Sequence, residues 1–358
     1  MSKLFTLSII PLLVSLLIAY LVTPFVIKFA KAIGAVDDPN INKHPKVIHT
    51  YPVPRAGGLA TFIALTISSL IFLPPDKYLL SILLGGALIA TIGTLDDKYN
   101  LNPYVRLLVQ FLVAGIPIAA GIGVSFINLP FTGIIDFADL KTGFFFLDVT
   151  FNSTLYSSIF TLFWIVFLMN MLNMGAKGVD GQLPGVVAIA SITIALLSLK
   201  FSADITQWPV IVLASIVAGA YLGFLPWNFY PQKIMPSFTG STLAGFMLAI
   251  LSILSTTKVG TLMVVLAVPL IDTGYAVIRR LIKRKSPVWG DRGHFHHRLL
   301  DVGWSKKKVA LFYWGITAMM GILALNLNAS YKLYTMIGVA VLMSGLILWL
   351  TYRQSIKN

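Results

Sequence analysis

Two adjacent carboxylates, Asp96 and Asp97, directly follow an apolar run, Tyr78 to Leu95, that is long enough to cross most of a bilayer. Charged groups so close to hydrocarbon are energetically costly, and in membrane proteins they usually mark functional sites. A carboxylate pair at a membrane face suits a hard cation such as Mg²⁺, which in turn suits phosphate oxygens. The pair therefore predicts phosphate chemistry at a membrane surface, with a helix end that merely faces water as the plainer alternative.

A second cluster lies nearer the C-terminus, where three of the five histidines fall within four residues. These are His294, His296 and His297, and Arg292 and Arg298 flank them. Arginine binds phosphate oxygens bidentately and histidine donates further hydrogen bonds, so the cluster predicts a phosphate clamp. Two other interpretations stay open: a basic loop held to anionic lipid headgroups, and a zinc site. The interleaved arginines and the absence of cysteine disfavour zinc.

A third polar stretch covers residues 170–182. Asn170 and Asn173 stand three residues apart and therefore share one face of a helix end. Asparagines at such a position commonly cap a helix, so this pair alone is a weak signal. A glycine-rich segment with Asp180 follows, but it is no P-loop because no strand and no Gly-Lys-Ser/Thr element is present.

Composition places all three clusters in a membrane protein. The chain has 358 residues, of which 57% are hydrophobic and only 11% are charged, and its mean hydropathy is +0.85. A soluble domain carries about twice that charged fraction. With no cysteine, disulfides, thiolate chemistry and cysteine-bound metals are excluded. The net charge of +14 indicates membrane topology and lipid contact rather than nucleic acid. The chain is therefore expected to be an all-α integral membrane protein.

Eleven transmembrane helices are expected, the first of them an uncleaved span rather than a signal peptide. They lie at roughly 4–27, 57–74, 78–95, 105–123, 155–173, 183–199, 207–226, 241–256, 259–279, 309–327 and 332–351. One side then holds six basic residues, namely Lys3, Lys77, Lys141, Lys200, Lys258 and Lys332. The other 21 of the 27 basic residues lie on the opposite side, which the positive-inside rule makes cytoplasmic. The N-terminus is then outside and the C-terminus cytoplasmic.

The loops divide by character between the two sides. The longest outer loop contains an aromatic and β-branched run, which predicts a small external β-hairpin near 136–152. The chain is otherwise expected to form a single polytopic domain, 1–358. Its five inner loops, at about 31–56, 96–106, 170–182, 228–241 and 279–308, hold almost all the unusual polar residues. Carboxylates, carboxamides, arginines and histidines on one face predict the binding of a nucleoside diphosphate at the membrane surface.

Four sequence motifs occur in order in these inner loops. They are His49 with Pro52-Val53-Pro54-Arg55-Ala56-Gly57-Gly58; Asp96-Asp97 with Arg106-Leu107-Leu108-Val109-Gln110; Asn170, Asn173 and Gly178-Val179-Asp180-Gly181; and Asp291-Arg292-Gly293-His294-Phe295-His296-His297-Arg298. Together they resemble the polyprenyl-phosphate N-acetylhexosamine-1-phosphate transferases, the superfamily of WecA, TagO and MraY, from about residue 5 to residue 350. The last motif resembles the WecA and TagO type more than the muramoyl-pentapeptide branch.

The resemblance implies a glycosyl-1-phosphate transferase. A HexNAc-1-phosphate, GlcNAc-1-phosphate before others, would pass from a UDP-sugar to an undecaprenyl-type polyprenyl phosphate, giving the polyprenyl-diphosphate-sugar and UMP. This is the first membrane step of cell-envelope glycan synthesis. The partners would be the UDP-sugar, the polyprenyl phosphate lipid and the plasma (inner) membrane, with no nucleic acid and with a homodimer left open. Because one anion must approach another, cationic screening should supply most of the catalysis.

The same resemblance implies roles for individual residues. Asp96 would orient or deprotonate the lipid phosphate with support from Asp97. Asp180 would contact the nucleotide. The implied catalytic residues are Asp96, Asp97, Asp180 and Lys177. The implied ligands of Mg²⁺, or of Mn²⁺ in its place, are Asn173 and Asp97. The implied substrate-binding residues are His49, Arg55, Arg106, Asn170, Asp180, Arg292, His294, His296, His297 and Arg298.

Two departures separate the chain from the family pattern. Lys177 stands at the first aspartate of Asp-Gly-x-Asp-Gly, with one extra residue before it, and Phe238 stands at a metal-binding aspartate. Two acidic groups are lost and one cation is gained, which puts Mg²⁺ dependence in question and predicts that Lys177 supplies part of the screening. The alternatives are an inactive homologue that binds polyprenyl phosphate, and a lipid transporter or flippase. A transporter is disfavoured because the polar residues gather at one face, with Asp272 the main charge inside a span.

Overall fold

Helices make up most of the protein in the computed structural model, which describes residues 5–42, 47–129, 133–137, 145–146, 149–150, 154–255, 258–286 and 293–357. The helices are η1 (Phe5–Ile9), α2 (Ile10–Ala32), α3 (Gly58–Phe72), α4 (Lys77–Tyr99), α5 (Pro103–Ala119), α6 (Thr154–Gly175), α7 (Gln182–Lys200), η2 (Ile205–Gln207), α8 (Trp208–Asn228), α9 (Ser237–Leu254), α10 (Lys258–Val265), α11 (Ala267–Ile282), α12 (Phe295–Asp301), α13 (Lys306–Ala324) and α14 (Ala329–Lys357). The expected all-α class is confirmed.

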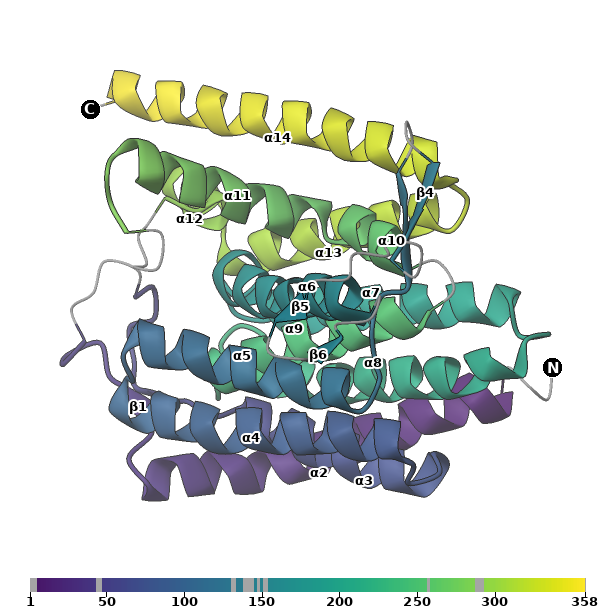
Figure 1. The fold of residues 1–358 in the computed structure, drawn as a ribbon. Coiled ribbons are helices and arrows are strands. Elements are labelled where there is room, and N and C mark those ends of the chain that lie inside the picture. Colours follow the sequence, from purple (N-terminus) through teal and green to yellow (C-terminus); the bar gives the residue numbers. More distant parts are fainter. Residues whose placement is uncertain are drawn as a thin grey trace.

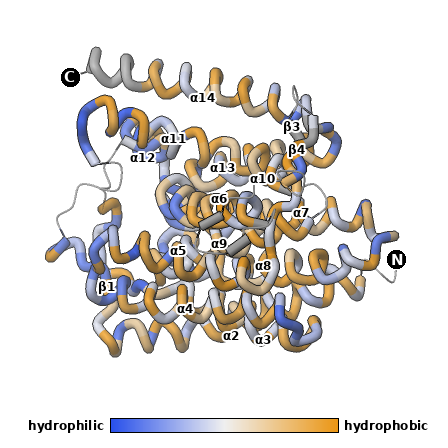
Figure 2. Tube along the Cα trace, in the orientation of Figure 1, coloured by the Kyte–Doolittle hydropathy of each residue, from blue (hydrophilic) through white to orange (hydrophobic). Residues whose placement is uncertain are grey.

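Seven of the described helices are long and apolar enough to cross a membrane. The pair α10 and α11 adds an eighth span if it counts as one helix broken by a bend of 84°. Helices α3 and α5 are apolar but shorter. Apolar residues dominate along the helices, whereas polar residues collect at their ends (Figure 2). The protein is therefore a multi-pass membrane protein, and the count of eleven spans stays a prediction.

The helices run side by side, and the two termini lie at opposite ends of the bundle (Figure 1). An odd number of membrane crossings requires the two termini to lie at opposite ends. The loop that carries β1 lies at the same end as the C-terminus, while the N-terminus lies at the end where β4 projects (Figure 1). The assignment of the C-terminal end to the cytoplasm remains a prediction.

Helix α9 forms the centre of the bundle. In its apolar window, 94% of the residues are buried inside the protein, against 17% for α14. It packs against α4 and α6, and the hydroxyl of Ser252 on α9 accepts a hydrogen bond of 3.0 Å from the indole N–H of Trp164 on α6. A polar pair of this kind satisfies groups that hydrocarbon could not. Because α9 is held on all sides, its first turn can serve as a fixed platform.

Three short antiparallel strand pairs complete the fold. Between α2 and α3, β1 (Val36–Asp37) pairs with β2 (Val53–Pro54). Between α5 and α6, β3 (Phe126–Leu129) pairs with β4 (Gly133–Asp136), and β5 (Phe145–Phe146) pairs with β6 (Val149–Thr150). The β5–β6 pair lies within the range expected for a hairpin, whereas the β3–β4 hairpin was not expected.

Candidate functional site

The turn between α4 and α5 sets the positions of the acidic pair and Arg106. Helix α4 ends at Asn100, which adopts the left-handed conformation with φ of 51°. The side chain of Asn102 then caps α5 by accepting a hydrogen bond of 2.9 Å from the N–H of Tyr104, and Pro103 occupies the first helical position. Asparagine at both caps and proline at the helix start are the residues that local helix chemistry favours. The turn is therefore short and defined by its own sequence.

Asp97 is buried and joins three segments at one point. Its Oδ2 accepts hydrogen bonds from the backbone N–H of Ala56 (3.1 Å) and from the hydroxyl of Thr239 (2.7 Å). Its Oδ1 accepts from the backbone N–H of Phe238 (3.2 Å) and lies 3.4 Å from Nη2 of Arg55. A buried carboxylate needs this many partners to offset its loss of hydration. Asp97 thus ties α4 to the loop before α3 and to the first turn of α9.

Asp96 has very different surroundings. It is fully buried, yet neither of its carboxylate oxygens has a hydrogen-bond partner among the described residues. The nearest cation is Arg106 on α5, whose Nε lies 3.5 Å from Oδ1. The guanidinium of Arg106 also lies over the ring of Phe238, at 5.4 Å from the ring centroid. A buried carboxylate without hydrogen bonds is costly, so Asp96 is the acidic group with capacity to receive a proton or a cation.

The two asparagines at the end of α6 serve different neighbours. Asn170 donates hydrogen bonds of 2.7 Å to Oε1 of Gln110 on α5 and 2.8 Å to the carbonyl of Val166. Asn173 accepts a hydrogen bond of 2.8 Å from the hydroxyl of Ser241 on α9. Asn173 and Asp97 therefore both contact the first turn of α9, from α6 and from α4. Asn170 instead fastens α6 to α5.

The loop between α6 and α7, residues 175–182, is held largely by one side chain. Oε1 of Gln182 accepts from the backbone N–H groups of Gly178 (3.0 Å) and Val179 (3.2 Å), and its Nε2 donates to the carbonyl of Gly175 (3.1 Å). From outside the loop, Oδ1 of Asn228 accepts from the N–H of Gly181 at 3.0 Å. The side chains of Gln182 and Asn228 therefore fix the conformation of the loop.

Asp180 lies in this loop and is the third buried carboxylate of the site. Its Oδ1 lies 3.5 Å from Nζ of Lys306, the first residue of α13, and its Oδ2 has no hydrogen-bond partner among the described residues. The ammonium of Lys306 also lies 5.4 Å from the ring centroid of Tyr230. Burial and the nearby Asp180 and Tyr230 raise the pKa of the Tyr51 phenol, whose hydroxyl donates to the carbonyl of Gln232 at 3.1 Å. Tyr51 therefore stays a neutral hydrogen-bonding group.

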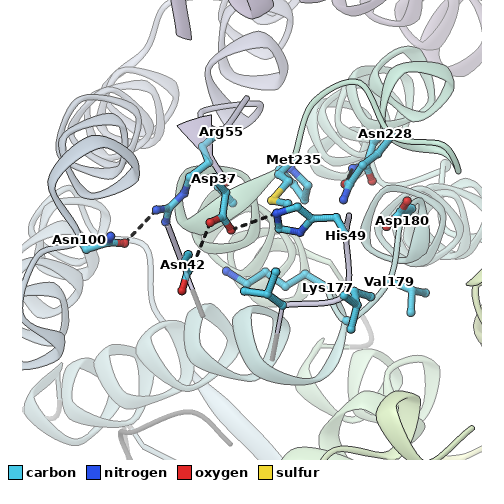
Figure 3. A pocket seen from close by; sticks show the side chains of 16 residues that line it. Asp37, Asn42, His49, Arg55, Asn100, Lys177, Val179, Asp180, Asn228 and Met235 are labelled. Atoms are coloured by element: carbon cyan, nitrogen blue, oxygen red, sulfur yellow. Dashed lines mark hydrogen bonds and ion pairs between the residues drawn. The ribbon is translucent and has the colours of Figure 1, made fainter. Parts of the chain in front are cut away.

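A cavity of about 210 Å³ lies between the loop after α2, the loop after α6 and the loop after α8 (Figure 3). Its lining includes Asp37, His49, Arg55, Lys177 and Asp180, so charges of both signs face it. Nε2 of His49 lies 3.9 Å from Oδ2 of Asp37, and Figure 3 shows the Lys177 side chain extending across the cavity. Lys177 also interacts electrostatically with Asp97. Arg55 and Lys177 thus bring positive charge both to the cavity and to Asp97.

The histidine segment meets the same loop. A Cβ at Gly178 would overlap the ring of His296, so backbone and ring are in direct contact. Nδ1 of His296 is buried and has no hydrogen-bond partner among the described residues. Burial, with smaller effects of His297 and His294, holds the pKa of His296 well below its ordinary value. His296 is therefore a neutral imidazole at neutral pH. The guanidinium of Arg298 lies 5.8 Å from the ring centroid of Tyr275.

The predicted site residues thus fall into three groups. His49, Arg55, Lys177 and Asp180 line the cavity, and Asp96, Asp97, Arg106 and Asn173 surround the first turn of α9. His294, His296, His297 and Arg298 form the third group, of which His296 touches the loop after α6. Asn170 contacts α5 instead, and Arg292 lies outside the described residues. These placements leave the functional role of each residue a prediction.

Several polar residues at the site escaped the sequence analysis. Lys306, Asn228 and Gln182 contact the loop after α6, and Arg280 contacts the histidine segment. Lys306 had no distinguishing signal because it is one of three consecutive lysines. Asp272 did have a recognisable sequence signal, because it is a charge inside an apolar run. Such charges usually have a polar partner nearby, so a partner for Asp272 could have been predicted.

Oxygen atoms around the first turn of α9 could help to hold a divalent metal. The described residues contain no group of three or more histidine, aspartate or glutamate side chains that could hold a metal ion by themselves. Asp96 does offer two buried oxygens without hydrogen bonds, and Asn173 offers a carboxamide oxygen beside the same helix turn. Mg²⁺ commonly binds through one or two protein oxygens together with substrate phosphates and water. The residues therefore fit a Mg²⁺ ion that the substrate shares.

Comparison with known proteins agrees with this chemistry. The model of glycosyl transferase family 4 matches residues 79–256. The chain is 32% identical to the probable undecaprenyl-phosphate N-acetylglucosaminyl 1-phosphate transferase of Bacillus subtilis, over 90% of this chain and 85% of the relative. It is 29% identical to the decaprenyl-phosphate N-acetylglucosaminephosphotransferase of Mycobacterium tuberculosis, over 92% and 85%. It is also 29% identical to the phospho-N-acetylmuramoyl-pentapeptide-transferase of Caldanaerobacter subterraneus, over 74% and 80%.

The relatives span nearly the whole chain, and their names share one reaction type, the transfer of a phospho-sugar. The match of the family model covers α4 to α9, which contain the acidic pair, the loop after α6 and the first turn of α9. The protein belongs to glycosyl transferase family 4, within the superfamily of polyprenyl-phosphate N-acetylhexosamine-1-phosphate transferases.

Proposed function

We propose that the protein transfers GlcNAc-1-phosphate from UDP-GlcNAc to a polyprenyl phosphate, giving polyprenyl-diphosphate-GlcNAc and UMP. The names of the Bacillus and Mycobacterium relatives give an N-acetylglucosamine donor group and an undecaprenyl or decaprenyl phosphate acceptor. The observation that carries the proposal is Asp96, a buried carboxylate at the end of α4 whose two oxygens have no hydrogen-bond partner among the described residues. A group in that condition is expected to gain its partner from the substrate.

The nucleotide and the diphosphate have natural places in this arrangement. Asp180, with its unpartnered Oδ2, would accept hydrogen bonds from the nucleoside. Arg55 and Lys177, which line the same cavity, would hold the diphosphate between them. The cavity of about 210 Å³ would take part of the donor. Electrostatic stabilisation by fixed cations is the largest contribution that such a site can make to phosphoryl transfer.

The reaction needs one bond made and one broken. An oxygen of the lipid phosphate forms a bond to the β-phosphorus, and the bond from that phosphorus to the bridging oxygen breaks, so that UMP leaves with the bridging oxygen. Asp96 would accept the proton of a monoprotonated lipid phosphate or orient its attacking oxygen. Arg106, 3.5 Å from Asp96, would offset the charge that gathers on the transferred group. Asp97 would fix the platform from which these groups act.

Mg²⁺ would be held by Asn173 and one oxygen of Asp96 together with diphosphate oxygens, which leaves the other oxygen of Asp96 for the lipid phosphate, and it would supply charge neutralisation on the diphosphate. Asp96 takes the place of Asp97, the other ligand that the resemblance implied, because both oxygens of Asp97 already accept hydrogen bonds. Phe238 adds no oxygen to this set, and its ring is covered by the Arg106 guanidinium. Lys177 is a half-buried cation at the same cavity. Its ammonium would supply part of the positive charge that a carboxylate-bound metal ion would otherwise provide. We therefore propose a weaker dependence on Mg²⁺ than carboxylate-rich relatives show, with Mn²⁺ able to replace Mg²⁺.

We further propose that this end of the bundle faces the cytoplasm at the plasma (inner) membrane. UDP-sugars are soluble cytoplasmic metabolites, so their binding loops must lie on that side. The distribution of lysine and arginine supports the same orientation.

The experiment is a transfer assay with purified protein in detergent micelles, a polyprenyl phosphate and a panel of UDP-sugars. UDP-GlcNAc should give the highest rate of UMP release, and Asp96→Asn should lose it. Absence of UMP release with every donor would favour an inactive homologue that only binds the lipid phosphate.

A further inference from the structure

We propose that Asp272 and Arg280 are positioning residues that fix His294 as a neutral imidazole with its proton on Nδ1. Through His294 they place His296 against the loop after α6. Only the expected effect on turnover rests on the proposed transfer reaction. The protonation state of His294 can be measured independently of turnover.

Asp272 anchors the start of α12 with both of its oxygens. It is fully buried on α11. Its Oδ1 accepts a hydrogen bond of 2.7 Å from the backbone N–H of Phe295, the first residue of α12. Its Oδ2 lies 3.1 Å from Nδ1 of His294. One carboxylate therefore holds the backbone that begins α12 and the imidazole ring beside it.

Arg280 determines which ring nitrogen of His294 carries the proton. Its Nη2 lies 3.3 Å from Nε2 of His294. A guanidinium has only donors, so Nε2 must accept and cannot carry a proton. The proton therefore sits on Nδ1 and is donated to Asp272, as in other carboxylate–imidazole pairs. Asp272 and Arg280 stand eight residues apart on α11, about two helical turns, so both face the same ring.

This arrangement leaves His294 no ring nitrogen for a diphosphate. The direct phosphate contact that the family resemblance implied for His294 is thus replaced by a positioning role. Its ring instead stacks on His296, with centroids 5.6 Å apart and planes inclined by 6°. His296 in turn touches Gly178 and has a buried Nδ1 without a hydrogen-bond partner among the described residues. His296 therefore has a ring nitrogen that can bind a substrate group.

The first test is spectroscopic. The protein is labelled with ¹⁵N-histidine, reconstituted in liposomes and examined by solid-state NMR at pH 7. The chain has five histidines, and His294→Asn assigns the signal of interest. We expect a ring with protonated Nδ1 and unprotonated Nε2, and we expect Arg280→Leu to allow protonation of Nε2 as well, because Asp272 still accepts the proton of Nδ1. A wild-type ring with its proton on Nε2, or protonated on both nitrogens, would overturn the proposal.

The second test is a double-mutant cycle on UMP release. Asp272→Asn and His294→Asn should each lower kcat/KM about 10- to 100-fold, and the double variant should lose no more than the worse single variant. Asp301→Asn, an exposed carboxylate on α12, serves as the control and should leave kcat/KM unchanged. A double variant whose loss equals the product of the two single losses would contradict action through His294. Thermal melting of each variant separates this effect from unfolding.

The two proposals fail in distinguishable ways. A wild-type protein that binds UDP-GlcNAc but releases no UMP would reject the transfer reaction and leave the NMR experiment to decide the positioning role. Normal UMP release by wild type together with the wrong tautomer would reject the positioning role alone.

Discussion

The imidazole of His296 lies directly on the backbone of Gly178, so closely that a single added Cβ at 178 would overlap the ring. The two residues stand in inner loops far apart in the sequence, and their contact joins the histidine segment to the loop that carries Lys177 and Asp180. Glycine is required here because any side chain would push α12 away from the cavity.

The contact between Gly178 and His296 predicts the effect of a methyl group. Gly178→Ala should lower kcat about 100-fold, because displacement of a site group by about 1 Å can cost that much. Gly274→Ala is the matched control, since a Cβ at 274 meets nothing within 4 Å. Steady-state kinetics of UMP release measure the effect. Equal activity of the two variants would mean that the position of His296 does not matter.

The acidic pair should separate into two phenotypes. Asp96→Asn should lower UMP release at least about 100-fold while the melting temperature stays near wild type, because Asp96 makes no hydrogen bond that an amide would break. Asp97→Asn should instead destabilise the fold by on the order of 2 kcal/mol, because an amide nitrogen cannot accept from the donors around it.

Thermal melting in detergent and UMP release are measured on the same preparations. A stable Asp97→Asn variant, or an Asp96→Asn variant with normal turnover, would contradict the division of roles between the two carboxylates.

Much of this arrangement could be predicted from sequence because it follows local patterns. The apolar runs predicted the helices, and the clustered polar residues identified the inner loops that meet around the cavity. Contacts between distant segments could not be predicted in the same way. Lys306 contacts Asp180 although the two residues are 126 positions apart in the sequence, and Ser241 contacts Asn173 across 68 positions. Local residue spacing cannot predict either contact.

The assignment of individual roles was limited for the same reason. Asp96 and Asp97 are adjacent aspartates that the sequence does not distinguish. In the structure, both oxygens of Asp97 accept hydrogen bonds, whereas those of Asp96 have no hydrogen-bond partner among the described residues. Likewise His294 and His296 belong to one motif, but only the three-dimensional structure reveals that Asp272 and Arg280 occupy both nitrogens of His294.

Lys177 should be essential and should reduce the need for Mg²⁺. Lys177→Ala should lower turnover about 100-fold or more, as the loss of one preorganised charge at a transferring phosphoryl group does. Wild type should show a shallow dependence on Mg²⁺ in a titration with EDTA controls. Lys98→Ala, an exposed lysine at the end of α4, is the control and should behave like wild type. Unchanged turnover in Lys177→Ala, with a steep Mg²⁺ requirement, would reject the substitution of a metal charge by lysine.

Membrane orientation can be tested cleanly because the chain contains no native cysteine. Cysteines placed at Thr50, in the loop after α2, and at Ser305, before α13, should react with an impermeant maleimide only from the cytoplasmic side. A cysteine at Thr206, between α7 and α8, should react only from outside. Intact cells and inverted vesicles provide the two sides. Labelling of Thr50 and Thr206 positions from the same side would contradict the predicted orientation.

The central claim is that the lipid phosphate attacks the β-phosphorus of a UDP-sugar, and the fate of that phosphorus tests it most directly. Purified wild-type protein is given polyprenyl phosphate and UDP-GlcNAc labelled with ³²P at the β-phosphorus. Phospho-sugar transfer predicts that the label moves into the organic-soluble lipid while unlabelled UMP is released, and that Asp96→Asn abolishes both. Label that stays in water-soluble UDP while the sugar alone reaches the lipid would contradict the account.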